Sequence, residues 1–139
     1  MSFVPIMIRD NLVYFIGKQG CTWSCTITLN QYGTDPPIPI DLTEYSVRSQ
    51  IRKTYDDAIP IATFNCTKVD DLAGKLNILL EAETTAALTA CKTSADSTNY
   101  ASADKAGQYV YDVEIYKGTP EVVHRAIQGI IYVDAEVTK

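Results

Sequence analysis

The sequence has little of what a membrane segment, a secretory leader or a nucleic-acid-binding surface needs. None of its 139 residues belongs to an apolar run near the roughly 20 residues that span a bilayer. The opening MSFVPIMIRD has neither a basic start nor a long apolar core, so we expect no signal peptide and synthesis in a cytoplasm. With a net charge of -5 and a pI of about 4.7, the chain lacks the excess of positive charge that a phosphate backbone attracts.

Groups that carry chemistry are also scarce. His124 is the single histidine, there is no GxSxG sequence, and the neighbouring charges suit an ordinary solvated strand end. The acidic pairs Asp56–Asp57 and Asp70–Asp71 lie in expected turns, where aspartate bonds to the backbone, and neither fits a calcium loop. We therefore expect no catalytic, cofactor-binding or metal-binding residues, and no enzymatic activity.

What is present is alternation. The stretch GCTWSCTITL (20–29) places apolar side chains on every second residue, which predicts a strand with one buried and one wet face. In DLTEYSVRSQIRK (41–53), Tyr45, Val47 and Ile51 are expected to face a core, and Arg48 and Arg52 to face water or a neighbour. Similar patterns predict further strands over 11–17, 61–69, 75–80, 107–118 and 121–137. Short turns join them, and 107–118 and 121–137 form a hairpin across KGTP, so the fold class is an all-β, antiparallel β-sandwich.

The remaining segments are irregular. Three prolines in four positions make 32–41 a loop. The stretch EAETTAAL predicts one short helix over about residues 82–89, because it combines good helix formers with early glutamates. Residues 89–106 are small and polar, which predicts a long loop insertion. We expect a single domain over 1–139, with residues 1–10 as an N-terminal arm.

Four cysteines raise the question of bridges. Cys21 and Cys25 lie four residues apart on one expected strand, so their Cα atoms are about 13 Å apart and cannot be bridged. We expect Cys21, Cys25 and Cys66 to be small buried hydrophobic groups. Cys91 lies in the polar insertion, where it is either a cross-link to a neighbouring chain or an unpaired thiol without a role.

Nine tyrosines give the chain many side chains that suit contact surfaces. Those on strands are expected in the core, and those in loops are candidates for partner contact. The candidate interface residues are Tyr32, Pro36, Pro37, Arg48, Arg52, Tyr55, Cys91 and Tyr100.

Several stretches resemble a family of small phage and prophage virion proteins. They are GCTWSCTITL, PIDLTEYSVRSQIRK (39–53), ETTAAL (83–88), GQYVYDVEIYKG (107–118) and the closing VDAEVT. The resemblance covers about residues 12–138, and it departs at the insertion 89–106 and at cysteines in core-like positions. It implies an immunoglobulin-like sandwich, similar in style to the N-terminal domains of baseplate upper proteins, and a structural role on a virion.

The resulting expectation is a non-enzymatic virion protein of the tail, baseplate or neck, assembled in the host cytoplasm. Its partners would be other virion proteins or copies of itself in a homo-oligomer, with no nucleic acid, no membrane and no cofactor. Two alternatives remain: a capsid decoration protein on the head surface, and a carbohydrate-binding adhesion module in which loop tyrosines and carboxylates form a shallow site.

Overall fold

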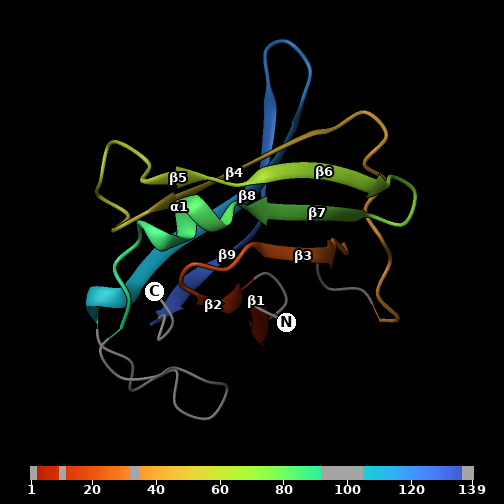
Figure 1. Ribbon diagram of the computed structural model, residues 1–139. Coiled ribbons are helices and arrows are strands. Elements are labelled where there is room, and N and C mark those ends of the chain that lie inside the picture. The colour runs from red at the N-terminus through yellow and green to blue at the C-terminus, as the bar shows by residue number, and fades with distance from the viewer. Residues whose placement is uncertain (1–2, 10–11, 32–34, 92–104, 136–139) are drawn as a thin grey trace.

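Two β-sheets face each other in the computed structural model, which describes residues 3–9, 12–31, 35–91 and 105–135 (Figure 1). The strands are β1 (Phe3–Arg9), β2 (Leu12–Lys18), β3 (Trp23–Thr28), β4 (Ser46–Arg52), β5 (Ala62–Thr63), β6 (Asn65–Asp70), β7 (Lys75–Leu80), β8 (Gln108–Lys117) and β9 (Val122–Asp134). One α-helix, α1 (Ala82–Ala86), and one 3₁₀ turn, η2 (Lys105–Gly107), complete the described elements. The predicted all-β sandwich with one short helix is confirmed. No helix in the described part of the chain has the length and apolar character needed to cross a membrane.

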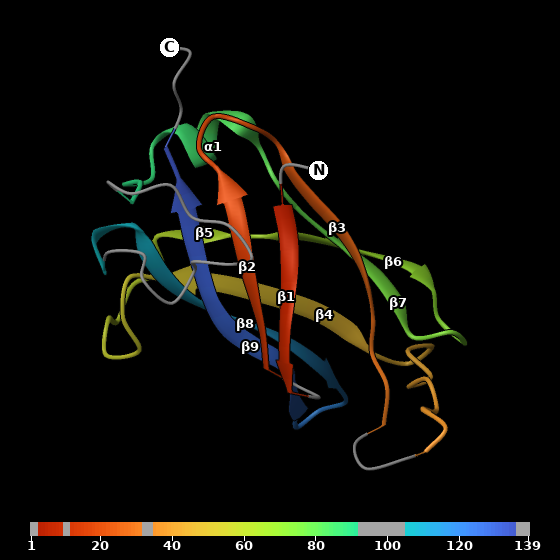
Figure 2. The same cartoon turned by 90° about the horizontal axis from the view of Figure 1, so that it is seen from below.

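The larger sheet has the order β1-β2-β9-β8-β4-β5, and the smaller has the order β3-β7-β6. The expectation of antiparallel pairing fails at one place, because β2 and β9 run parallel, with Phe15 opposite Ile131. The β8–β9 hairpin already fixes the direction of β9, and the β1–β2 hairpin docks on its free edge. Figure 2 shows β1, β2 and β9 side by side.

The first ten residues are more ordered than the expected N-terminal arm. Residues 3–9 form β1, which pairs antiparallel with β2 from Phe3 opposite Gly17 to Arg9 opposite Leu12. The prediction of an N-terminal arm is therefore wrong for residues 3–9, because their backbone groups pair with those of β2.

The segment 61–69, predicted as one strand, divides between the two sheets. Residues 62–63 pair with β4 in the larger sheet, and residues 65–70 pair with β7 in the smaller one. Phe64 lies at the switch, where its side chain is buried and its amide donates to the carbonyl oxygen of Ser49 at 3.2 Å. The chain thus crosses from one layer to the other at a single buried aromatic residue.

The helix is shorter than the expected 82–89. It ends at Ala86, and the amide of Leu88 then closes a turn onto the carbonyl oxygen of Thr85 at 3.2 Å. Leu88 itself is buried in the core. The turn that follows the helix thus places Leu88 in the core.

The core lies between the two sheets and takes every second residue of the long strands. Its largest fully buried side chains are Trp23, Phe15, Leu42, Ile51, Leu76, Ile78 and Ile131. Tyr45 and Val47 pack against this cluster, as predicted for the strand at 45–53. Gly17 lies under Trp23, and a Cβ at residue 17 would collide with the indole ring. A glycine is therefore needed at residue 17 for the indole to pack closely against β2.

Candidate functional site

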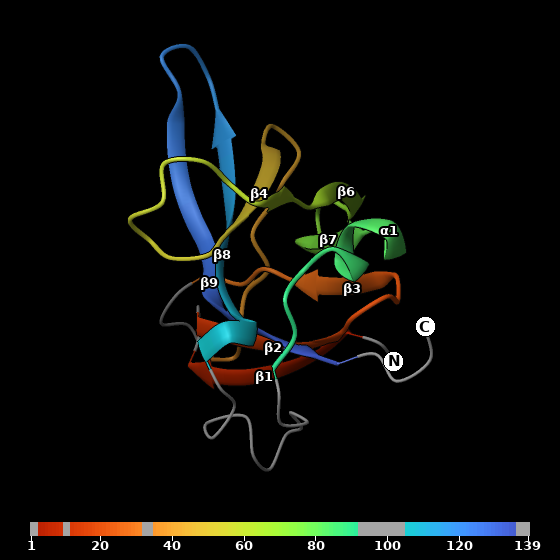
Figure 3. The same cartoon turned by 60° about the vertical axis from the view of Figure 1, so that its left-hand side comes forward.

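A polar groove opens on the outer face of the larger sheet, beside the loop that joins β4 to β5. That loop can be followed in Figure 3. Its volume is about 640 Å³. The lining residues are Arg48, Ser49, Gln50, Arg52, Tyr55, Asp57, Ala58, Asp112, Glu114 and Arg125. We call this feature the polar groove, because three guanidinium groups and three carboxylates dominate its lining.

Strand register builds the floor of the polar groove. Glu114 of β8 lies directly between Arg48 of β4 and Arg125 of β9. The next outward row places Asp112 between Gln50 and Gln128. Opposite charges on neighbouring strands attract at this spacing, so the rows stabilise the alignment of the three strands.

Arg48 is held from three sides. Its Nε donates to Glu114 at 2.9 Å, its Nη1 donates to Glu121 at 3.3 Å, and its guanidinium carbon lies 4.4 Å from the centre of the Tyr116 ring. The hydrogen bond to Glu114 raises the pKa of this guanidinium above its usual range. The guanidinium of Arg48 therefore already forms ion pairs within the chain, and does not need an acidic group from a neighbouring chain.

The other two arginines are also fixed by acceptors. Arg52 donates to Gln50 Oε1 at 2.9 Å and to the carbonyl oxygen of Asp57 at 2.5 Å. Arg125 lies 3.4 Å from Asp112 Oδ2 and donates to Gln128 Oε1 at 3.1 Å. Each arginine keeps further N–H groups beyond these bonds, because a guanidinium carries five.

Two titratable groups in the polar groove have shifted pKa values. Partial burial raises the pKa of Asp112, the negative charge of Glu114 acts in the same direction, and Arg125, Arg52 and Arg48 oppose it. Partial burial also raises the pKa of Tyr55, whose phenol is near enough to Tyr14, Arg125 and Asp112 to respond to them. Shifted groups in a concave site are typical of functional sites.

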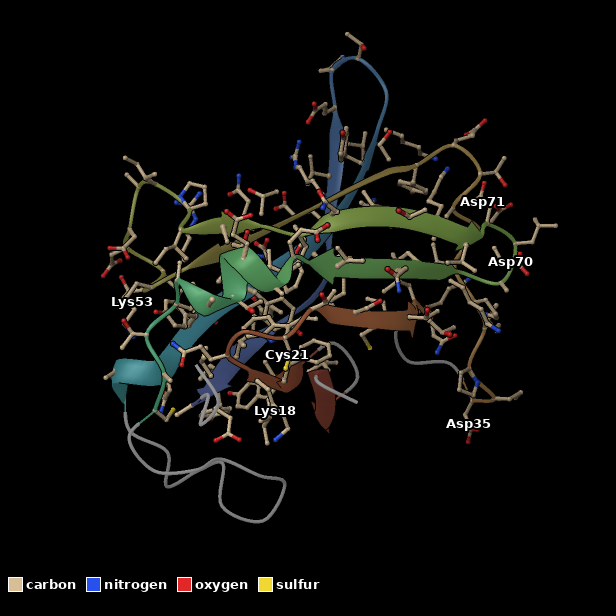
Figure 4. All side chains as sticks on the ribbon, in the orientation of Figure 1. Lys18, Cys21, Asp35, Lys53, Asp70 and Asp71 are labelled. Atoms are coloured by element: carbon tan, nitrogen blue, oxygen red, sulfur yellow. The ribbon has the colours of Figure 1, made fainter. Side chains whose placement is uncertain are left out.

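The structure brings together three of the eight predicted interface residues. Arg48, Arg52 and Tyr55 all line the polar groove. Pro36 and Pro37 are exposed in the loop after β3, far from it: Figure 4 places Asp35 and Lys53 at opposite ends of the molecule. Tyr32 and Tyr100 lie outside the described residues.

Cys91 is buried, whereas a cross-link to a neighbouring chain, one of the two alternatives for it, needs an accessible thiol. Its side chain is 1% exposed and packs with Ile16 and Tyr132, and its amide donates to the carbonyl oxygen of Val133 at 2.8 Å. The start of the predicted insertion is therefore tied to β9. In this conformation the thiol of Cys91 is too deeply buried to form a disulfide with another chain.

The other three cysteines divide differently. Cys25 and Cys66 are free thiols that pack against the core as predicted. Burial raises the pKa of Cys25, and raises that of Cys66 to about 11. The prediction for Cys21 is wrong: it is exposed, because the chain turns at Gly20 (φ 81°) and β3 begins only at Trp23.

His124 and the acidic pairs Asp56–Asp57 and Asp70–Asp71 lie at the surface and are partly or fully exposed. His124 is exposed on β9, with its ring 6.2 Å from that of Tyr45. Asp57 and Asp70 accept hydrogen bonds from the backbone amides of Thr54 and Ala73, as expected of turn residues. No group of three or more His, Cys, Asp or Glu residues is placed to bind a metal within the described ranges.

Sequence reasoning missed Asp112, Glu114 and Arg125 as members of one site. Their outward position on β8 and β9 follows from alternation. Their proximity to Arg48 and Tyr55 depends on strand order and register. An alternating pattern of apolar and polar residues does not specify either of these.

No family model and no curated protein matches the chain. Among solved structures, it is similar to a nucleoside hydrolase-related hypothetical protein from Saccharophagus degradans, described as associated with carbohydrate metabolism. The TM-score is 0.36 at 12% identity, over 96% of this chain and 26% of that one. The chain thus spans about a quarter of the length of that protein.

Proposed function

We propose that the chain is a non-enzymatic structural protein of a phage virion, which assembles by protein–protein contacts on the tail, baseplate or neck. The virion context rests on the sequence resemblance described above. The assembly role is supported by the geometry of one projecting element.

That element is the hairpin arm, residues 116–124, formed by the end of β8, the turn after it and the start of β9 (Figures 1 and 3). Val122 and Val123 are 50% and 41% exposed, and as successive strand residues they point to opposite sides. A projecting element with apolar side chains on both sides suits insertion between two neighbouring chains, where that surface leaves water. This exposure is the observation that carries the proposal.

The base of the hairpin arm is fixed to the body. Lys117 Nζ lies 3.8 Å from Glu44 Oε2 and 4.7 Å from the centre of the Tyr45 ring. The Tyr45 ring also meets the ring of His124. A held arm loses little conformational freedom when a partner binds, so more of the contact energy remains as affinity.

Other turns also expose large apolar side chains. Ile59 and Ile61 lie in the loop between β4 and β5. Val69 lies near the end of β6, and Leu72 lies in the turn that follows it. Figure 1 shows these turns on opposite sides of the sandwich, with the hairpin arm pointing away from both. Contacts in several directions suit a repeating subunit with more than one neighbour, as in a closed ring.

The first test is to locate the chain in intact particles at side-chain resolution and to count its copies. A ring on the tail, baseplate or neck with the hairpin arm buried between subunits is the expected result. Hundreds of copies over the head would make it a capsid decoration protein. Absence from the particle would overturn the proposal.

The second test measures self-association of the full chain by sedimentation velocity. We expect the double substitution V122S/V123S to weaken association by about tenfold or more, since it removes the exposed apolar area of the arm. The control is V122I/V123I, which keeps β-branched apolar side chains at both positions and should associate as the wild type does. Equal association of the wild type and V122S/V123S would remove the arm from the contact.

A further inference from the structure

The polar groove has a lining that is dense in charge yet balanced. Three arginines face three carboxylates, so their formal charges cancel. An anion seated there would meet Asp57, Asp112 and Glu114, and a cation would meet the arginines. The lining thus disfavours net charge of either sign on a ligand.

The same lining offers donors and acceptors in adjacent pairs. Arg125 lies 3.4 Å from Asp112, and Arg48 lies 2.9 Å from Glu114. A hydroxyl group donates one hydrogen bond and accepts others, so it can accept from the guanidinium and donate to the carboxylate of one pair. A peptide N–H group only donates and a peptide C=O group only accepts, so a single group of either kind fulfils one of these two roles. Neighbouring hydroxyl groups on a rigid ring therefore match the lining best.

One aromatic ring, that of Tyr55, belongs to the lining of the polar groove. Tyr55 is 67% exposed, although its own loop holds it beside the sheet. It shares the lining with Asp112 of β8 and Arg125 of β9. An exposed aromatic face next to paired polar groups can cover the apolar C–H face of a ring whose hydroxyl groups point to the floor.

We propose that the polar groove binds a neutral saccharide unit, with Tyr55 against its C–H face and Asp112 and Arg125 bonded to its hydroxyl groups. The volume of about 640 Å³ lies within the range of small-molecule sites, roughly 300–1,000 Å³. The arginine pairs hold their geometry without a ligand, so the site is formed in advance. This inference does not rest on the virion role.

The experiment uses the full chain and an array of neutral and sulfated oligosaccharides, followed by NMR titration with the neutral oligosaccharide that binds most tightly. We expect binding to neutral members, with amide shifts concentrated at β4, β8 and residues 54–58. Y55A should weaken binding by about tenfold, as removal of one aromatic anchor does. D112N should weaken it by about fivefold, through the loss of one charged acceptor.

Two matched variants serve as controls. I59A changes an 80% exposed residue of the same loop, and D56N changes an exposed aspartate beside Asp57, and neither residue lines the polar groove. Both should bind within about twofold of the wild type, as surface changes away from a contact do.

Three outcomes would overturn the inference. One is the absence of binding to any neutral oligosaccharide at millimolar concentration. Another is tighter binding of sulfated members, which would mean that the arginines act as an anion site. The third is silence on the array together with weaker self-association of Y55A, which would make the polar groove a protein contact. V122S/V123S tests assembly separately, so failure here leaves the proposed function standing.

Discussion

The two faces of the larger sheet carry different kinds of side chain, although they belong to the same strands. Along β8, Tyr109, Tyr111, Val113 and Ile115 point inward and are almost fully buried. The residues between them include Asp112 and Glu114, which point outward into ion pairs. The inner face is stabilised by apolar area removed from water. Partly exposed ion pairs such as those outside are worth about 0–1 kcal/mol each.

The comparison teaches that one strand can serve stability and recognition at once. A change on the inner face must disturb close packing. A change on the outer face leaves the core intact and alters what the surface can bind. Four substitutions test this division, beginning with the largest expected effect.

Consecutive isoleucines on β9 give the sharpest test. Ile131 is fully buried in the main core, and Ile130 points outward and is partly buried beside Tyr132. I131A should lower the free energy of unfolding by about 2–5 kcal/mol, measured by urea denaturation, because it leaves a cavity. I130A should cost about 1 kcal/mol or less, since less apolar area is removed from contact. Equal losses would erase the distinction between the faces.

The second test fills a space on the inner face. Gly129 lies opposite Tyr111 in the β8–β9 register, and a Cβ at residue 129 would collide with the carbonyl oxygen of Val13 on β2. Because backbone cannot move aside as a side chain can, G129A should cost about 1–3 kcal/mol in urea denaturation. A loss below about 0.5 kcal/mol, the usual range for surface changes, would show that β2 is not held tightly against β9.

The third test removes one hydroxyl from each face. Tyr111 donates a buried hydrogen bond to the carbonyl oxygen of Val13, so Y111F should cost about 1 kcal/mol. Tyr116 on the outer face meets Arg48 through its ring, which Y116F retains, so that change should fall within about 0.5 kcal/mol. Thermal or urea unfolding of both variants checks the pair. A larger loss of unfolding free energy from Y116F than from Y111F would show that, of these two hydroxyl groups, the outer one contributes more to stability.

The fourth test uses pH and concerns the smallest effect. Because burial raises the pKa of Asp112, the folded protein favours its protonated form. Its contribution to stability is therefore present below the ordinary aspartate pKa of 3.8, and is lost as pH rises through the raised value. D112N does not titrate at residue 112. The difference in unfolding free energy, variant minus wild type, should rise by under about 1 kcal/mol across that window.

The control for this experiment is D56N, at an exposed turn residue. Its difference from the wild type should stay flat over the same pH range. A difference for D112N that falls as pH rises would mean that the three arginines outweigh burial at this carboxyl.

Alternation predicted most strands well, because burial on one face leaves a period of two in the sequence. The strand predicted at 75–80 has the same limits as β7, and the outward placement of Arg48 and Arg52 is confirmed. Alternation failed at Cys21, where the turn at Gly20 displaces the chain before the strand starts. It also could not show that Phe64 divides one apolar stretch between two sheets.

The polar groove was less predictable than the fold. Arg48 and Tyr55 were singled out one by one, as side chains suited to contact. Their union with Asp112 and Arg125 depends on pairing between residues more than 50 positions apart. Such pairing reflects which strand edges remain free after the hairpins form, and a single periodic pattern does not contain that information.

The parallel pairing of β2 with β9 has a consequence for how the chain folds as it is synthesised. β2 can join the larger sheet only after its partners, which lie between Gln128 and Asp134, have been made. Until then the β1–β2 hairpin has no edge to dock on, and Phe15 has no Ile131 opposite it. Contacts between segments so far apart in sequence slow folding, because a long loop must close before they form. Truncation before residue 128 should therefore leave the first hairpin detached, whatever its own sequence favours.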